Sequence, residues 1–167
     1  LWGNPLYNWA AMETDDFAWW EKRIVASAAL YDVIRIDHFI GIVRYYSIPA
    51  EEKTAMNGTW KEGPGKKLLQ AFGEVLTDTK IIAEDLGLVT PEVRRVKDQA
   101  GYPGMKLMEF GFDAGAANTN LPIHFEQKCV VYGGTHDNET LAGYFEKAKR
   151  REVQFAKRYL QVKKRND

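Results

Sequence analysis

Four short apolar runs have the length and composition of buried β-strands. Aliphatic and β-branched residues dominate them, and loops bound them on both sides, as is typical of strands covered on both faces. These predicted strands are 33–36 (VIRI), 80–83 (KIIA), 105–110 (MKLMEF) and 129–134 (CVVYGG). The first strand carries Arg35 and is followed by Asp37, and these two charges point to the same face because side chains alternate along a strand.

Helical spacing of apolar residues predicts helices between these runs. Residues 15–32 repeat aromatic and aliphatic side chains on one face, and Thr14 is placed to act as the N-cap. Residues 91–100 follow Thr90 as N-cap, begin with a proline and end before a glycine, which are strong start and stop signals. Further helices are predicted over 68–76 and, as one long charged amphipathic helix, over 141–164.

Two stretches without a periodic pattern are expected to be loops. Residues 2–12 contain turn-forming Gly, Asn and Pro, and residues 47–67 form a long segment rich in Gly and Pro. Loops as long as the second are usually functional, so it is a candidate lid. Strands that alternate with helices indicate parallel βα units and therefore an α/β fold.

Composition narrows the class of protein further. The 167 residues have a length typical of one domain. With 23 basic and 23 acidic residues the net charge is zero, which argues against nucleic acid or an anionic membrane as the main partner. The single cysteine, Cys129, excludes an internal disulfide and a CxxC metal site. No apolar run reaches the roughly 20 residues that span a bilayer.

Acidic residues follow three of the four predicted strands. Asp37 follows the first directly, Glu84 follows the second, and Asp137 comes shortly after the fourth. In a (β/α)8 barrel such strand ends meet on the face that carries the active site. Two carboxylates that flank one bond are the equipment of a glycosidase. Each acid alone could instead cap a helix, as Asp85 could, or form a structural ion pair with Arg35, but three at equivalent positions favour the catalytic interpretation.

Six segments resemble, in family order, the signature segments of the 4-α-glucanotransferases, also called amylomaltase or disproportionating enzyme (glycoside hydrolase family 77, in the α-amylase clan). The resemblance covers nearly the whole chain, up to about residue 145. The segments are WGNPLYNW (2–9), RIDHF (35–39), IPAEEKTAMNGTWKEGPG (48–65), IIAEDLG (81–87), GYPGMKLMEFGFD (101–113) and GGTHDNET (133–140).

The resemblance implies a fold larger than this chain. The family enzyme is much longer, and by resemblance the strands here are the fourth to seventh of its eight-stranded barrel. We therefore expect residues 1–167 to be a fragment of a single catalytic (β/α)8 barrel domain, truncated at both ends and inactive alone. The chain begins with Leu1 rather than Met and ends in a charged segment, which agrees with that expectation.

The same resemblance assigns roles to the three acids. Asp37 is implied as the nucleophile, Glu84 as the general acid/base and Asp137 as the transition-state stabiliser of a retaining transfer between α-1,4-glucans. The chemistry agrees, because a retaining reaction uses one ionised and one protonated carboxyl on either side of the bond. Arg35, on the same strand face as Asp37, can keep that carboxylate ionised and fix its rotamer.

Several residues are candidates for binding sugar. Aromatic rings match the apolar faces of glucose, and loop tryptophans are more often functional than helix tryptophans. His136 resembles the clan's sugar-binding histidine, and this role is favoured over the alternative that it satisfies a backbone carbonyl. Asn138 could orient its loop. For Phe110 the sequence alone favours packing over contact with substrate. The substrate-binding candidates are Trp2, Arg35, Trp60, Phe110, His136 and Asn138.

The expected partners are maltooligosaccharides and other α-1,4-glucans, without nucleic acid, membrane, metal or organic cofactor. No acids have metal-ligand spacing. The resemblance implies a cytoplasmic enzyme of starch, glycogen or maltodextrin metabolism, or a plastid one if the source is a plant; the oligomeric state is left open. Two alternatives stay open: a hydrolase of the α-amylase clan, which would share the acids but differ in acceptor-side loops, and a non-catalytic glucan-binding or remnant domain.

Overall fold

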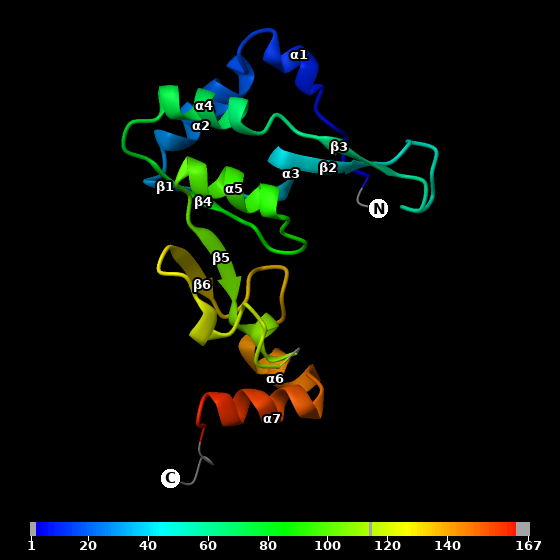
Figure 1. Cartoon of the computed structure of the whole chain (residues 1–167), viewed down its shortest axis with the longest axis vertical. Helices are drawn as coiled ribbons and strands as arrows, with labels where there is room; N and C mark the ends of the chain where they lie inside the picture. Colours follow the sequence, from blue (N-terminus) through cyan, green and yellow to red (C-terminus); the bar gives the residue numbers. More distant parts are fainter. Residues whose placement is uncertain (1–2, 114, 163–167) are drawn as a thin grey trace. The chain divides into compact units, whose positions relative to one another are not determined.

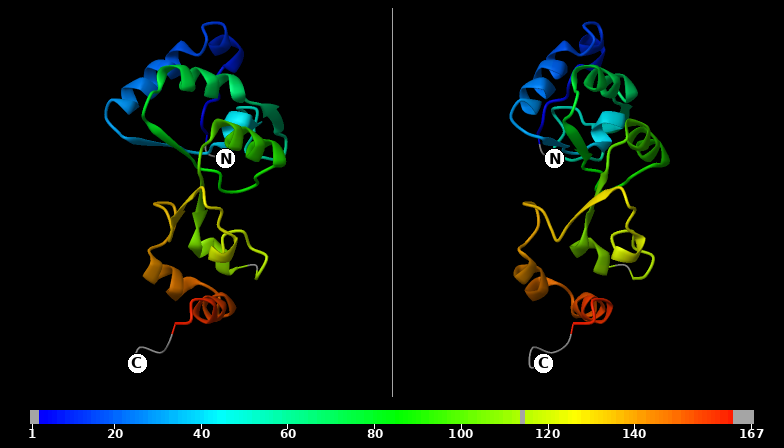
Figure 2. Two further views of the ribbon diagram at one scale, coloured as in Figure 1. Left: turned by 60° about the vertical axis from the view of Figure 1, so that its left-hand side comes forward. Right: turned by 90° about the vertical axis from the view of Figure 1, so that its left-hand side faces the viewer.

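The computed structural model describes residues 3–113 and 115–162, and the chain divides into two compact units, Leu1–Gly104 and Met105–Asp167. Both units contain helices as well as strands (Figures 1 and 2). This confirms the predicted α/β class. Each unit is described by itself below.

The first unit is organised around a parallel pair of strands. β1 and β4 pair with Val33 opposite Lys80 and Ile36 opposite Ala83, which confirms both predicted strands and their direction. The strands of this unit are β1 Val33–Ile36, β2 Arg44–Ser47, β3 Thr59–Glu62 and β4 Lys80–Ala83, and its helices are α1 Trp9–Glu13, α2 Ala18–Ala28, α3 Ile40–Val43, α4 Lys66–Val75 and α5 Pro91–Ala100.

The core of this unit lies where the helices meet β4. Leu68 and Phe72 are one turn apart on α4, and both are almost fully buried because they share one helix face. Phe39, Ile81 and Val93 supply the side chains that α4 packs with from the other elements. Burying each such side chain contributes about 1.5–3 kcal/mol.

The expectation that β1 is a buried strand is wrong. Its side chains alternate between exposed and half-buried, and Val33 is exposed. Among the described residues β1 pairs with β4 alone, so one edge of the strand has no ladder partner. The apolar composition of residues 33–36 predicts a buried strand. The actual burial depends on neighbouring elements, which the composition does not specify.

Two expectations about the start of the chain are also wrong. Residues 9–13 form α1, capped by the Asn8 side chain, inside the predicted loop. Thr14 ends this helix instead of beginning the next one, and its hydroxyl donates a hydrogen bond to the Ala11 carbonyl (2.7 Å). α2 starts only at Ala18 because Asp16 and Phe17 take left-handed backbone conformations that interrupt the helical path.

The predicted long loop contains regular structure. Strands β2 and β3 form an antiparallel pair with Tyr46 opposite Trp60, and α3 precedes them directly. Trp60 therefore lies on strand β3. Glycine and proline are frequent in the residues around this pair. Composition alone therefore predicts a loop where the structure has a short hairpin.

Helix α5 has the caps that the sequence predicts. The Thr90 hydroxyl accepts a hydrogen bond from the Val93 backbone N–H (3.4 Å), and Gly101 ends the helix in the left-handed conformation (φ 75°).

Thr90→Ala is expected to lower the free energy of unfolding by about 1 kcal/mol, because it leaves an N-terminal amide of α5 without its cap. Thr90→Ser keeps the hydroxyl and should stay close to the original chain. Urea unfolding followed by tryptophan fluorescence measures the difference. Equal losses in both variants would mean that the methyl group, and not the cap, stabilises this helix end.

The second unit is smaller and less regular. Phe112, Leu121 and Ala156 form its core, with Phe145, Phe155 and Tyr159 packed against them. Its strands are β5 Gly104–Leu107, whose first residue belongs to the first unit, and β6 Cys129–Tyr132; its 3-10 helices are η1 Met108–Phe112 and η2 Pro122–His124; and its α-helices are α6 Leu141–Lys147 and α7 Arg150–Tyr159. β5 and β6 pair in one small sheet.

The single long helix predicted over 141–164 is two helices, with its last residues outside the described part. Ala148 and Lys149 take extended backbone conformations between α6 and α7. The break lets Phe155 and Tyr159 of α7 pack on Phe112. No glycine or proline marks this break, so the charged helical pattern continues through it in the sequence.

Candidate functional site

Arg35 and Asp37 form an ion pair at the carboxyl end of β1. An Arg35 guanidinium nitrogen, Nη2, lies 3.0 Å from Asp37 Oδ1. The Arg35 side chain is 32% exposed and that of Asp37 is 73% exposed. The pair therefore sits at an open strand end, where it contributes little to stability. What it does is hold one oxygen of Asp37 in a fixed direction.

The Glu84 carboxyl is held by two backbone amides. Its Oε2 accepts a hydrogen bond from His38 N–H (2.7 Å), and its Oε1 accepts one from Leu86 N–H (3.0 Å). Two donors from the backbone restrict this side chain to one position. The His38 amide reaches it because His38 adopts a left-handed conformation (φ 47°) just past β1.

The backbone ladder brings Asp37 and Glu84 to neighbouring strand ends. Ile36 and Ala83 are partners in the β1–β4 register, so Asp37 and Glu84 each follow a paired residue. The ladder continues past the strands, with Glu84 N–H donating to the Ile36 carbonyl (2.9 Å) and Phe39 N–H donating to the Glu84 carbonyl (2.8 Å). Asp137 belongs to the second unit and is described there.

A hollow of about 720 Å³ lies beside Asp37. Its lining includes Arg35, Asp37 and His38, together with aromatic side chains that the sequence did not single out. Those aromatic residues are Tyr7, Trp9, Trp20, Tyr45 and Phe72. Tyr7 makes ring contacts with Trp9 (centroids 5.0 Å apart) and Trp20 (5.2 Å). Only two of these residues carry a signal in the sequence: Tyr7 and Trp9 fall within the first family-like segment.

Asp137 lies in a loop that is closed by its own side chains. Asn138 Oδ1 accepts hydrogen bonds from the N–H (2.8 Å) and hydroxyl (3.0 Å) of Thr135. The Asp137 N–H donates to the Thr135 hydroxyl (3.3 Å), and His136 Nε2 lies 3.4 Å from Asp137 Oδ1. Asn138 thus orients the loop through its amide, while His136 and Asp137 are both exposed.

Asp137 does not cap helix α6, which was the alternative role for this residue. Thr140 caps α6 and accepts a hydrogen bond from Gly143 N–H (3.2 Å). A second hollow instead lies beside Asp137 and Asn138, and Phe110 lines it with a partly exposed ring. Glu109 also lines this hollow, and nothing in the sequence distinguished it.

Asp85 has a structural role that differs from the cap predicted as its alternative. Its Oδ2 lies 2.9 Å from Lys97 Nζ on α5, and both side chains are buried. Gly104 passes so close that a Cβ there would meet Asp85 Oδ2 at 2.5 Å and Lys97 Nζ at 2.8 Å. The ion pair therefore requires glycine at this position.

The remaining sugar-binding candidates lie apart from these acids or outside the described residues. Trp2 falls outside the described residues. Trp60 on β3 stacks beneath the Arg44 guanidinium, whose Cζ is 4.3 Å from the ring centroid, and meets the Tyr46 ring at 5.3 Å. Such a cation–π contact fixes the ring and leaves Trp60 half exposed.

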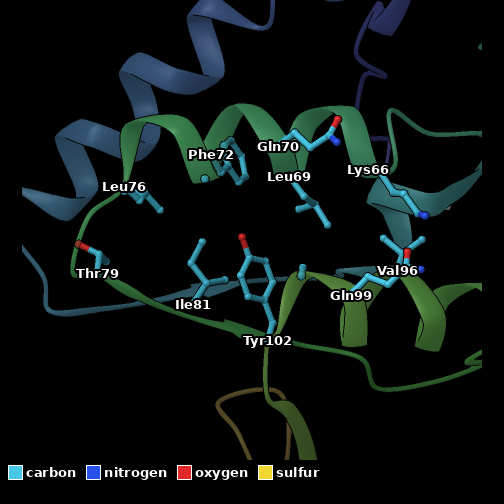
Figure 3. Close-up of a pocket in the computed structure, with 12 residues that line it drawn as sticks. Lys66, Leu69, Gln70, Phe72, Leu76, Thr79, Ile81, Val96, Gln99 and Tyr102 are labelled. Carbon is cyan, nitrogen blue, oxygen red and sulfur yellow. The ribbon is translucent and has the colours of Figure 1, made fainter.

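A further hollow separates α4 from α5 (Figure 3). Leu69, Phe72 and Val96 form apolar walls, and the Tyr102 ring stands between the helices with its hydroxyl directed toward α4. Burial raises the pKa of the Tyr102 hydroxyl. The side chains around this hollow include none of the predicted site residues, so we assign it no part in the site.

Two kinds of feature are absent from the described residues, 3–113 and 115–162. No group of three or more His, Cys, Asp or Glu side chains there could hold a metal ion. No helix in that part of the chain is both long and apolar enough to cross a membrane.

Comparison with known proteins gives a consistent result. A family model described as 4-alpha-glucanotransferase matches residues 1–167. The 4-alpha-glucanotransferase of Clostridium butyricum is 49% identical over 146 residues, which cover 87% of this chain and 30% of that protein. The chloroplastic/amyloplastic 4-alpha-glucanotransferase of Arabidopsis thaliana is 45% identical over 167 residues, which cover 100% of this chain and 29% of that protein.

A solved structure agrees with these relatives. The amylomaltase of Streptococcus agalactiae, in complex with acarbose, superposes with a TM-score of 0.93 and 39% sequence identity over 99% of this chain and 34% of that one. The chain thus spans about a third of the length of the proteins it matches. Because the family model matches every residue, the chain belongs to the 4-alpha-glucanotransferase family.

Proposed function

We propose that the protein containing this chain is a retaining 4-α-glucanotransferase that moves an α-1,4-glucan segment to the 4-hydroxyl of an acceptor sugar. The observation that carries the proposal is the pair of carboxyls at neighbouring strand ends. One is directed by a guanidinium and the other by two backbone amides. Family membership supplies the substrate class.

Asp37 acts as the nucleophile in this proposal. Arg35 holds Oδ1, so Oδ2 attacks the anomeric carbon and forms a covalent glucosyl ester. The bond from that carbon to the leaving oxygen breaks, and Glu84 gives its proton to this oxygen. Glu84 then takes the proton of the acceptor 4-hydroxyl as that oxygen attacks the ester, and the Asp37 carboxylate is released.

Asp137 completes the proposed set as the residue that stabilises the transition state. Its carboxylate is exposed, and the Thr135–Asn138 hydrogen bonds fix the loop that carries it. His136 and Asn138 are proposed to bind sugar hydroxyls beside it, and Phe110 to contact a sugar face. The same proposal joins both units in one (β/α)8 barrel domain to which this chain contributes the fourth to seventh strands.

Transfer instead of hydrolysis requires that a sugar displaces water from the acceptor side. The aromatic hollow beside Asp37 supports this requirement, because flat rings bind the apolar faces of glucose. Trp2 and Trp60 are proposed to add further sugar contacts. The structural relative was solved in complex with acarbose, an observation that agrees with a sugar-like ligand for this family. We propose a cytoplasmic location, or the plastid stroma for a plant source.

A graft tests the proposal directly. In a chimeric protein that we call the graft, residues 1–167 replace the matching segment of the Streptococcus agalactiae amylomaltase. All three acids of the graft then come from this chain. Maltotriose should yield glucose and a ladder of longer maltodextrins, whereas residues 1–167 alone should yield neither. Glucose without longer products would favour the hydrolase, and maltodextrin binding by a folded graft without any product would favour the glucan-binding domain.

A further inference from the structure

Glu109 is a buried carboxyl, and one of its oxygens has no hydrogen-bond partner among the described residues. It follows β5 directly, within η1, and is only 7% exposed. Its Oε1 atom has no partner among the described residues. Buried carboxyl oxygens are ordinarily hydrogen-bonded, because leaving one unpaired costs free energy. A buried group that breaks this rule calls for a functional explanation.

The carboxyl of Glu109 lies beside Gly134, at the start of the loop that carries Asp137. The Glu109 N–H donates to the Gly133 carbonyl (3.1 Å), which ties η1 to the residue after β6. A Cβ on Gly134 would lie 3.1 Å from Glu109 Cδ and Oε1, and 3.1 Å from the Asn138 Cβ. Gly134 is therefore enclosed between the Glu109 carboxyl and the residue that closes the loop.

An ionised carboxylate is unfavourable at this place. Oε1 meets no donor, so a negative charge there would be buried without compensation. The titratable groups that line the same hollow as Glu109 are mostly acidic: Asp137 and Glu139 from the loop and Glu152 from α7, with Tyr144 and Lys147 from α6. Lys147 is already paired with Glu139.

We propose that Glu109 is a positioning residue for Asp137, and that its uncharged carboxyl holds the 133–138 loop in place. The inference deepens the proposed function and rests on it, since Asp137 matters only if it stabilises the transition state. Glu109 itself would touch no substrate. It would act through Gly134 and Asn138, and ionisation would loosen the loop.

The direction of the titration agrees with this role. Burial, and then the nearby Glu139, raise the pKa of Glu109 above 4.5. The protonated form is thus favoured by the folded unit. Its contribution is fully present below pH 4.5 and is lost as the pH rises through the raised pKa.

Hydrogen exchange tests the proposal without any activity. The amides of Thr135, Asp137 and Asn138 all donate within the loop, so their protection reports its closure. Protection, corrected for the intrinsic exchange rate, should fall as the pH rises in the original chain. Glu109→Gln should keep the protection at all pH values, and Glu109→Ala should lower it at least about tenfold throughout. Glu146→Gln, an exposed carboxyl on α6, is the matched control and should behave like the original chain.

Activity in the graft provides the second readout. Glu109→Gln should retain kcat, while Glu109→Ala should lower kcat more than KM. A loop whose protection does not change with pH, or a Glu109→Gln variant that exchanges like Glu109→Ala, would overturn the inference. An inactive graft with the expected exchange pattern would overturn the proposed function alone. All the contacts involved lie within residues 105–162, so residues 1–167 alone serve equally for the exchange measurement.

Discussion

Asp37→Asn is expected to lower transfer activity of the graft at least about a thousandfold, because an amide oxygen does not form the glucosyl ester on which the second step depends. The change preserves size and leaves an oxygen for the Arg35 guanidinium, so the fold should be unaffected. The measurement is the initial rate of glucose release and ladder formation from maltotriose, with circular dichroism to verify folding.

Asp78→Asn is the matched control for this substitution. Asp78 is exposed before β4 and outside the site, so the variant should keep nearly all activity. If Asp37→Asn retained more than about a tenth of the rate, the nucleophile would lie elsewhere and the proposed mechanism would fail. Loss of activity in both variants would indicate a general sensitivity of the graft and would not support a specific role for Asp37.

Lys97→Met is expected to lower the free energy of unfolding of the first unit by about 3–5 kcal/mol. The Lys97 side chain is 8% exposed and its partner Asp85 is 7% exposed, so the variant takes the cation away from a carboxylate that water cannot reach. Methionine fills a similar volume, and the loss should therefore come from electrostatics and not from a cavity. Urea unfolding followed by tryptophan fluorescence measures it, because Trp9, Trp19, Trp20 and Trp60 lie in this unit.

Lys53→Met makes the same change on an exposed loop and should shift stability by less than about 0.5 kcal/mol. A Lys97→Met variant as stable as this control would show that the Asp85 carboxylate needs no cation.

Local signals allowed prediction of those elements whose ends are fixed by their own residues. The strands at 33–36 and 80–83 and the helix at 91–100 appear where the sequence predicts them. Thr90 and Gly101 act within one turn of their own positions, which makes such caps readable. The break at Ala148 and Lys149 has no local signal, because packing of α7 on Phe112 determines it.

The same distinction between local signals and contacts with distant residues applies to the candidate site. Asp37, Glu84 and Asp137 could be singled out because each follows a predicted strand within a family-like segment. Tyr7 and Glu109 could not, because their relation to the acids arises from contacts between elements distant in sequence. The structural role of Asp85 was not predicted for the same reason, because its partner Lys97 lies in another element, helix α5.

The parallel pairing of β1 with β4 has a kinetic consequence. Its register joins Val33 to Lys80, and the whole of α3, the β2–β3 pair and α4 lie in the loop between them. Closing so long a loop costs chain entropy before any ladder bond is gained. The hairpin and helices can form from contacts close in sequence, so we expect the strand ends that carry Asp37 and Glu84 to assemble after these local elements.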